Sequence, residues 1–440
     1  MRDYVVLGVI FVSVAAALLR PFVGVLAWTW VSFMNPHRLS WGVARTFPVA
    51  LVVALATLAG VVLSGEPKQL PRNPGTRLLF ALWACLSIST ALALHSDTAL
   101  EAWILRSKIL LMAILTMTLL KDRERLRWLC IVTALSVGFF GLKGGIFTII
   151  TGAQYQVLGP EDTFLGDNTS LALALTMVLP ILFYLTRDVN QKPLRWLLWA
   201  TFVFSIPAII GTYSRGGLLG LAAVAMTMFA KGGRKLFGVV LLTAATVAVI
   251  TLAPQKWSQR METIGHYQSE ASAMARIHAW TLAWRLALAR PIFGWGPQAM
   301  DDKKLYDTYY PESPGRDDVH NSYLQLLAEC GFVTFAVFAA LLGWCLLHLR
   351  RLSALFRESP EHTWVATYAD MLQVSLIGYV VSAAFLEMAF FDLLYHIVAS
   401  SIALVQLAAG LEVKSAVPLR RAAHVPLAPV PRATTAVSAG

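Results

Sequence analysis

The sequence has few charged residues: Asp, Glu, Lys and Arg make up 14% of its 440 residues, whereas 57% are hydrophobic. Because an average soluble domain is about 25% charged, this composition excludes an ordinary soluble protein. The apolar residues recur in runs long enough to cross a bilayer. The first run, Tyr4 to Leu19, is followed by neither a small-residue cleavage site nor a polar domain, so we expect a retained anchor and not a signal peptide.

Cysteine is scarce, and acidic metal-binding patterns are missing. All four cysteines lie in apolar segments without CxxC spacing, which argues against a zinc site and a disulfide framework: Cys85, Cys130, Cys330 and Cys345. The acidic pairs Asp301-Asp302 and Asp317-Asp318 do not form a DxD pattern, and helix capping or solvation explains them more simply. We therefore predict no obligatory metal and no cofactor.

The sequence also lacks a long polar domain. The longest segment between expected spans, Ala253 to Asp318, has about 66 residues, too few for an ordinary nucleotide-binding α/β domain. A sugar-nucleotide enzyme is thereby disfavoured. Within this segment, bulky apolar residues recur at helical spacing and predict an amphipathic helix on the membrane surface, opened by Arg276 and ended by Pro291: Ile277, Trp280, Trp284 and Leu288.

The apolar runs predict an all-α polytopic membrane protein with about twelve transmembrane helices. Arg20 and Pro21 divide the region Tyr4 to Met34 into two short pieces, which we expect to cross once. Further spans are expected at Phe47 to Leu63, Leu78 to Leu94, Trp103 to Leu120, Leu126 to Ile150, Ser170 to Leu185, Trp196 to Thr212, Gly216 to Ala230, Leu236 to Leu252, Val319 to Leu347, Trp364 to Ala384 and Phe385 to Ala409. This organisation gives nine helices in residues 1–252, a periplasmic loop with amphipathic helices at 253–318, three helices in 319–411 and a disordered cytoplasmic tail at 412–440.

The net charge of +11 raises the possibility of a nucleic-acid partner, but the positions of the basic residues favour another explanation. With a cytoplasmic N-terminus, 21 of the 36 Lys and Arg residues fall in cytoplasmic segments, as the positive-inside rule requires. We therefore predict that both termini are cytoplasmic and that the protein binds membrane lipids and no nucleic acid.

Arg215 lies in the segment Gly211 to Gly217, a tight junction between two spans on the predicted outer side. Arginine near hydrocarbon is costly and usually faces a cavity and a partner, and the flanking glycines allow close backbone approach to a ligand. We expect a polyanionic ligand. The alternative is an arginine that reaches lipid phosphates at the interface.

Arg276 and His320 are candidate partners of Arg215 on the same side. Arg276 could help to bind a diphosphate, or it could be an ordinary interfacial arginine. We expect His320 in the first turn of a span, with Asp318 as the N-cap. A neutral imidazole there could accept a proton from a hydroxyl, although a lone histidine at a helix start is often structural. Further outward cations that could line the same cavity or contact headgroups are Arg38, Arg45, Arg106, Lys108 and Lys143.

Three segments together carry a family resemblance: Ser214 to Gly217, Arg276 followed by Pro291-Ile-Phe-Gly-Trp-Gly-Pro297, and His320-Asn-Ser-Tyr through to Gly331. In their order and spacing they resemble the O-antigen ligase and polymerase superfamily. The first part of the chain, especially Leu26 to Trp41 and Gly141 to Phe147, is similar to the exosortase-associated O-glycosylation ligases.

The resemblance implies a metal-independent, inverting membrane glycosyltransferase of the GT-C type in a bacterial inner membrane, with its active site facing the periplasm. It would transfer glycan from undecaprenyl diphosphate to a lipid A-core hydroxyl in lipopolysaccharide biosynthesis. The family roles carry over to His320, Arg215 and Arg276 as catalytic residues. Substrate-binding roles are expected for Arg38, Arg45, Arg106, Lys108, Lys143, Ser214, Asn321 and Tyr323.

Other functions share this chemistry or this architecture. An O-antigen or exopolysaccharide polymerase would use the same donor, and a protein O-oligosaccharyltransferase would differ in its acceptor. A lipid-linked glycan transporter would also need a cationic cavity, but broken helices at mid-membrane and pseudo-symmetric halves are not apparent in the sequence.

Overall fold

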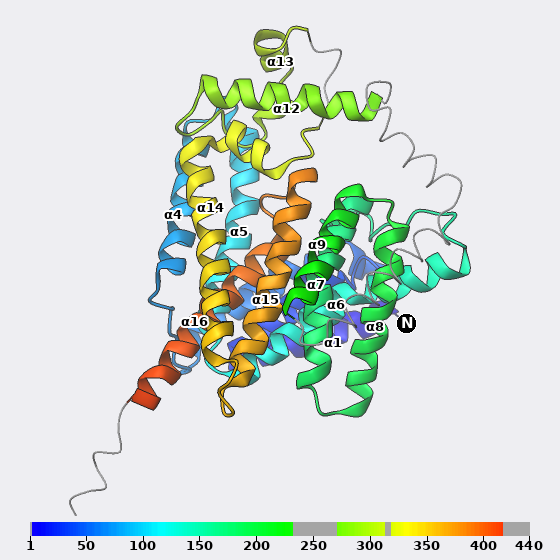
Figure 1. The fold of residues 1–440 in the computed structure, drawn as a ribbon, viewed down its shortest axis with the longest axis vertical. Coiled ribbons are helices and arrows are strands. Elements are labelled where there is room, and N and C mark those ends of the chain that lie inside the picture. Colours follow the sequence, from blue (N-terminus) through cyan, green and yellow to red (C-terminus); the bar gives the residue numbers. More distant parts are fainter. Residues whose placement is uncertain (1, 232–270, 313–317, 417–440) are drawn as a thin grey trace, which may run out of the picture.

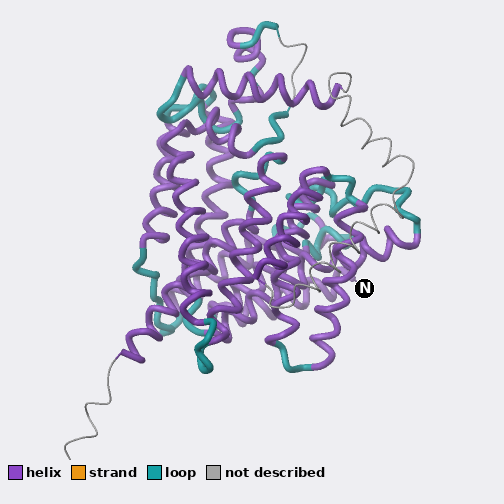
Figure 2. The backbone as a smooth tube through the Cα atoms, in the orientation of Figure 1, coloured by secondary structure: helices purple, strands orange, loops and turns teal. Residues whose placement is uncertain are grey.

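The computed structural model describes residues 2–231, 271–312 and 318–416. Within these ranges the chain forms helices and loops and no strand (Figure 2). The α-helices are α1 (Arg2–Leu19), α2 (Pro21–Met34), α3 (Val49–Leu63), α4 (Pro74–Ala91), α5 (Ser96–Leu119), α6 (Arg123–Ile150), α7 (Asn168–Asp188), α8 (Lys192–Gly211), α9 (Arg215–Lys231), α12 (Ala271–Ala289), α13 (Lys303–Tyr309), α14 (Ser322–Phe356), α15 (Thr363–Ser382) and α16 (Asp392–Ala416). Short 3-10 turns lie at η1 (Val43–Arg45), η3 (Ala299–Asp301) and η4 (Ala383–Phe385).

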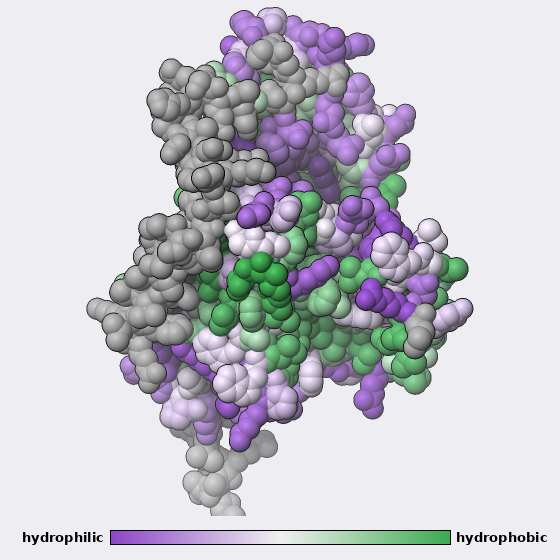
Figure 3. All heavy atoms as spheres, turned by 90° about the vertical axis from the view of Figure 1, so that its right-hand side faces the viewer, coloured by the Kyte–Doolittle hydropathy of each residue, from purple (hydrophilic) through white to green (hydrophobic). Residues whose placement is uncertain are grey.

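Eight of the described helices are long and apolar enough to cross a membrane: α1, α5, α6, α7, α8, α14, α15 together with η4, and α16. The apolar helices α2 and α3 are shorter. On the face that Figure 3 shows, apolar side chains are concentrated in the middle, and hydrophilic residues gather above and below them. The predicted all-α polytopic membrane fold is confirmed. The expected span Leu236 to Leu252 and residues 417–440 lie outside the described residues.

The N-terminal region, for which the sequence predicted a single crossing, forms two separate helices. Arg20 has a non-helical backbone, with φ −134° and ψ 89°, and Pro21 begins α2, because proline fits the first turn of a new helix but cannot continue an old one. Gly42, beyond the end of α2, packs against Asp3 at the start of α1, and Gly60 of α3 packs against Ala17 near the end of α1. The start of α1 and the loop after α2 are therefore neighbours, and α1 and α2 form a hairpin.

Helix α7 is the centre of the bundle. Every residue from Ser170 to Thr186 is buried, and the sequence of this stretch shows no polar face. Helices α6, α8, α9 and α15 all pack against it. A helix that is apolar all round is expected at such a central position.

Glycines allow α6 and α8 to pack closely. A methyl group added at Gly138 or Gly141 would clash with Thr201 or Ser205 of α8, and one at Gly145 would meet the backbone carbonyl of Phe204. Small residues at such spacing are typical of helix contacts in membranes. The glycines around Lys143 therefore serve helix packing.

Helix α14 is interrupted at Gly331, which has φ 78° and ψ 174°. Since a side chain at this residue would meet the carbonyl oxygen of Ile292, glycine is needed both for the backbone conformation and for close approach. The interruption frees the N–H of Phe332 to donate to the carbonyl oxygen of Pro291 at 2.7 Å.

The segment after α12 docks on this interruption. The N–H groups of Trp295 and Gly296 donate to the carbonyl oxygens of Ala328 and Glu329, at 3.2 and 2.8 Å. Two of the motifs that carried the family resemblance, residues 291–297 and 320–331, thus form one unit. This unit holds α12 across the upper end of the bundle, where Figure 1 shows it nearly perpendicular to α14.

Candidate active site

Arg215, Arg276 and His320 line one cavity of about 690 Å³. They come from the start of α9, from α12 and from the segment before α14, and all three are half-buried. The remaining lining residues include Ser214, two helix starts and the turn between α15 and α16: Gln156, Asp167, Asn168, Thr169, Ser170, Tyr213, Gly216, Asp318, Phe385, Leu386, Glu387 and Met388. Residues far apart in the sequence therefore share one polar cavity.

The start of α9 supplies one wall of this cavity. Arg215 is the first residue of the helix, and the Ser214 hydroxyl accepts the N–H of Gly217 at 3.1 Å. A side chain at Gly216 would contact Phe385 at 2.9 Å, so glycine allows the turn after α15 to approach. A helix N-terminus carries partial positive charge, which adds to that of the guanidinium group and favours an anion in the cavity.

Helix α12 holds Arg276 above the cavity. Trp280, one turn further along the same face, donates from its indole N–H to the carbonyl oxygen of Val319 at 2.7 Å. Val319 directly precedes His320, so this bond fixes the helix that carries Arg276 to the segment that carries the imidazole. Arg276 lies in the second turn of α12 and does not open the helix as predicted.

Helix α12 also has a buried face that the sequence analysis did not name. This face packs on α14 and is made of Leu282, Ala283 and Leu286. Ile277, Trp284 and Leu288, which we expected to form the membrane-facing side, are exposed, as that position requires, and the membrane contact itself stays a prediction.

His320 precedes α14 instead of lying in its first turn, and the N-cap is Asn321 instead of Asp318. The Asn321 carboxamide oxygen accepts the N–H groups of Tyr323 and Leu324, at 3.0 and 3.1 Å. Since asparagine is among the best N-caps, the helix begins one residue after it.

His320 and Tyr213 both have left-handed backbones, with φ 44° and 57°. Such conformations cost about 1–3 kcal/mol and persist where the surrounding structure fixes them. Beside His320, the Ser322 hydroxyl donates to the carbonyl oxygen of Leu386 at 2.6 Å and accepts the N–H of Met388 at 2.8 Å. The segment that carries His320 is thus anchored to the turn between α15 and α16 through Ser322.

The sequence analysis did not place any acidic residue in the cavity, but three acidic residues line it: Asp167, Asp318 and Glu387. Asp167 caps α7 by accepting the N–H groups of Thr169 and Ser170. Burial acts to raise the pKa of Asp167, but hydrogen bonds from Ser170 and Thr169 outweigh it and lower the pKa. Asp167 therefore has a structural role.

Glu387 has no such capping role. Burial, reinforced by the nearby carboxylates of Glu329, Asp318 and Asp301, raises the pKa of Glu387 to about 7. A carboxyl group with this pKa, in the cavity that His320 and the two arginines also line, can exchange protons near neutral pH, which is common at catalytic sites. The sequence signal was weak, because Glu387 lay within a stretch assigned to a transmembrane span.

Replacing Glu387 with glutamine should stabilise the protein increasingly as pH rises. The pKa of Glu387 in the folded protein exceeds its ordinary value of 4.5, which we take for the unfolded chain. As pH rises, the unfolded chain therefore loses this proton at a lower pH than the folded protein does. The stability of the folded protein falls as pH rises from about 4.5 through about 7. Above pH 7 the penalty is about 3 kcal/mol. Melting temperatures of the detergent-solubilised variant and wild type should therefore diverge between about pH 5 and about pH 8. The exposed Glu361→Gln should show no such divergence, and parallel curves for Glu387→Gln would contradict the assignment.

Apart from Ser214, the predicted substrate-binding residues lie outside the cavity lining. Arg38 and Arg45 pair with Asp162, at 3.6 and 4.0 Å. Lys108 and Lys143 are exposed on α5 and α6. Their substrate-binding roles remain predictions, and the glycines beside Lys143 already have a packing role.

Arg106, Asn321 and Tyr323 have structural partners. The guanidinium of Arg106 is buried, pairs with Glu329 at 2.9 Å and lies over the ring of Phe390. Asn321 caps α14, and the Tyr323 hydroxyl donates to the carbonyl oxygen of Val380 at 2.7 Å. Of the eight residues expected to bind substrate, Ser214 is the one that lines the cavity.

The chain, including the segment that contains Arg215, Arg276 and His320, can be compared with known families. Residues 200–339 match the O-antigen ligase family. This segment includes Arg215, Arg276 and His320, and the match supports a ligase-type glycosyltransferase in a membrane. Residues 1–190 match a family of unknown function, DUF5935. No curated protein matches the chain.

Proposed function

We propose that the protein is an O-antigen ligase that transfers a glycan from undecaprenyl diphosphate to a hydroxyl of the lipid A core. The observation that carries this proposal is the shared cavity of Arg215, Arg276 and His320. The O-antigen ligase match over the same residues supports it independently. The exosortase-associated subgroup, and with it a protein or exopolysaccharide acceptor, remains an alternative.

In the proposed reaction, the two arginines bind the diphosphate of the donor. The bond between the anomeric carbon and the diphosphate oxygen breaks, and its electron pair stays with the oxygen. Guanidinium groups match phosphate oxygens through paired hydrogen bonds and stabilise the negative charge as it develops. Because diphosphate is a good leaving group, no proton donor is needed for its departure.

His320 acts as the general base in this scheme. Its neutral imidazole takes the proton of the acceptor hydroxyl as the hydroxyl oxygen forms its bond to the anomeric carbon. Attack from the face opposite the diphosphate inverts the configuration at that carbon. Glu387, across the same cavity, is suited to hold an acceptor hydroxyl or to receive the proton afterwards.

We propose that the cavity faces the periplasm. Basic connections gather at the other end of the bundle, where ion pairs join Lys121 to Glu66, Arg123 to Asp188, and Lys231 to Asp370. The positive-inside rule makes that end cytoplasmic, together with the end of α16. Since the start of α1 packs beside Gly42, the same orientation puts the N-terminus on the periplasmic side, contrary to the expectation from the sequence.

Reconstitution would test this function and separate it from its nearest alternative. Purified protein should be incubated with undecaprenyl-diphosphate-linked glycan and lipid A core, and the products resolved by gel and mass spectrometry. We expect glycan on lipid A core and free undecaprenyl diphosphate. Lengthened glycan still attached to undecaprenyl diphosphate would indicate a polymerase, and an unchanged donor with every acceptor would contradict a transferase.

A further inference from the structure

A second cavity lies at the end of the bundle opposite the candidate active site. It has a volume of about 1070 Å³ and lies between the connection before α4, the turn between α5 and α6, the start of α15 and the end of α16. Helices α15 and α16 run from this cavity to the other, so the two sites are separated by the length of the bundle. We call it the basic groove; its lining residues include Lys68, Arg72, Lys121, Arg123 and Trp364.

Two of the four cations of the basic groove are neutralised by carboxylates. Lys121 pairs with Glu66 at 2.8 Å, and Arg123 pairs with Asp188 at 2.5 Å. Lys68 donates to the carbonyl oxygen of Ser64, a neutral group. For Lys68 and Arg72 the structure gives no ion pair with any described carboxylate, and both are exposed. The carboxylate in the groove lining, Asp122, caps α6 and pairs with Arg125 at 3.7 Å. The rim at Lys68 and Arg72 therefore has excess positive charge.

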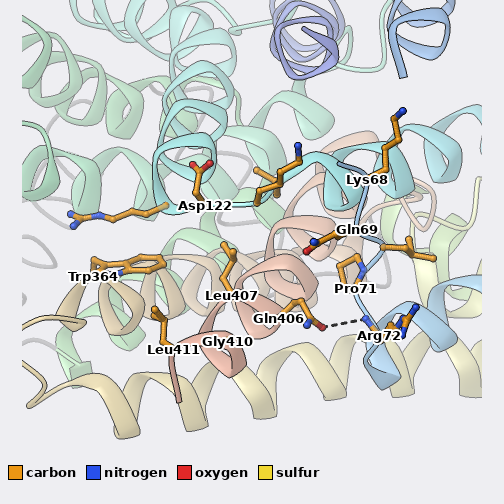
Figure 4. Close-up of a pocket in the computed structure, with 14 residues that line it drawn as sticks. Lys68, Gln69, Pro71, Arg72, Asp122, Trp364, Gln406, Leu407, Gly410 and Leu411 are labelled. Carbon is orange, nitrogen blue, oxygen red and sulfur yellow. Dashed lines mark hydrogen bonds between the residues drawn. The ribbon is translucent and has the colours of Figure 1, made fainter. Parts of the chain in front are cut away.

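The inner surface of the basic groove is apolar, with amide groups at its edge. Leu407 and Leu411 of α16 lie on the same side of the groove as Trp364, across from Pro71 and Arg72 (Figure 4). The Gln406 carboxamide oxygen accepts the backbone N–H of Arg72 at 3.2 Å and so joins the rim to α16. A tryptophan at the end of a membrane helix, beside exposed cations, is typical of headgroup depth.

We propose that the basic groove binds an anionic phospholipid. The phosphate and the negative headgroup lie against Lys68 and Arg72, the headgroup hydroxyls contact Gln69 and Gln406, and an acyl chain lies along Leu407 and Leu411. Basic side chains and an apolar surface at one interfacial site match both parts of such a lipid. A small soluble anion would use the cations but leave the apolar surface uncovered.

The chain's own C-terminal segment is a poorer occupant. Residues 417–440 contain Arg420, Arg421 and Arg432 and no acidic residue. This segment and the rim would repel each other. An anionic lipid, in contrast, is abundant at the membrane surface and complements the charge.

Lipid titration of the purified full-length protein tests this site without any glycan transfer. Native mass spectrometry and thermal shift would follow binding of phosphatidylglycerol, with phosphatidylcholine and inorganic phosphate as comparison ligands. The test variant is Lys68→Gln/Arg72→Gln. The control is Lys192→Gln/Arg195→Gln, which removes the same charge from exposed residues of another basic connection outside the groove.

We expect phosphatidylglycerol to bind wild type and control alike, and to bind the groove variant about tenfold or more weakly, since two charge contacts are lost. Melting temperatures without added lipid should agree among the three proteins, which excludes misfolding as the cause. Equal binding to the groove variant and the control, equal binding of phosphatidylcholine, or a thermal shift with inorganic phosphate matching that of the lipid would each overturn the proposal.

Discussion

His320→Asn is expected to reduce glycan transfer by about 10²–10⁴-fold, the usual contribution of a general base. Asparagine is preferable to alanine here because His320 has φ 44°, and asparagine tolerates the left-handed conformation. The variant therefore removes the base while keeping the turn before α14. Rates should be measured with purified donor and acceptor, and donor should accumulate in cells while mature glycoconjugate disappears.

The matched control for His320→Asn is His95→Ala. His95 is also near the end of the bundle that holds the cavity, where it contacts Asp302 at 2.8 Å, but it does not line the cavity. It should keep near-normal transfer. Normal transfer by both His320→Asn and His320→Ala would refute the base assignment, and loss in His95→Ala as well would point to a general disturbance of this end of the bundle.

The sequence predicted well those features that depend on local pattern. The spans followed from apolar runs. Arg215 stood out because an arginine near hydrocarbon is costly and usually faces a cavity, and because glycines flank it. The positions of Arg276 and His320 relative to Arg215 were predicted by family resemblance, since nothing in their spacing requires three separate segments to meet. The shared cavity depends on long-range contacts, such as the bond between Trp280 and Val319.

The features that the sequence did not reveal also have physical causes. Arg106 was grouped with the outward cations, and its ion pair with Glu329, 223 residues away in the sequence, follows from no local pattern. Lys143 lies among glycines that pack against α8, a contact that the glycine spacing alone did not indicate. Glu387 was hidden in an apolar stretch, and its raised pKa arises from burial, reinforced by carboxylates on other segments. Each case required a tertiary neighbour that no local pattern reveals.

Arg215→Gln is expected to lower the turnover number by about 10²–10³-fold, the cost of losing one group that stabilises developing charge in a transition state. Glutamine keeps hydrogen-bonding ability and approximate length but removes the positive charge. Because the diphosphate becomes more negative as it departs, the loss should appear mainly in kcat, and the KM for the acceptor should change little.

Arg215→Lys separates charge from geometry. Lysine retains the charge but offers no paired hydrogen bonds, so its activity should fall between those of wild type and Arg215→Gln. Arg285→Gln is the control, since Arg285 pairs with Glu312 and does not line the cavity. If Arg285→Gln were as impaired as Arg215→Gln, general surface charge would explain the effect. If instead Arg215→Gln raised only the KM for the donor, Arg215 would bind the diphosphate equally before and during its departure, and the charge that speeds bond cleavage would have to come from Arg276.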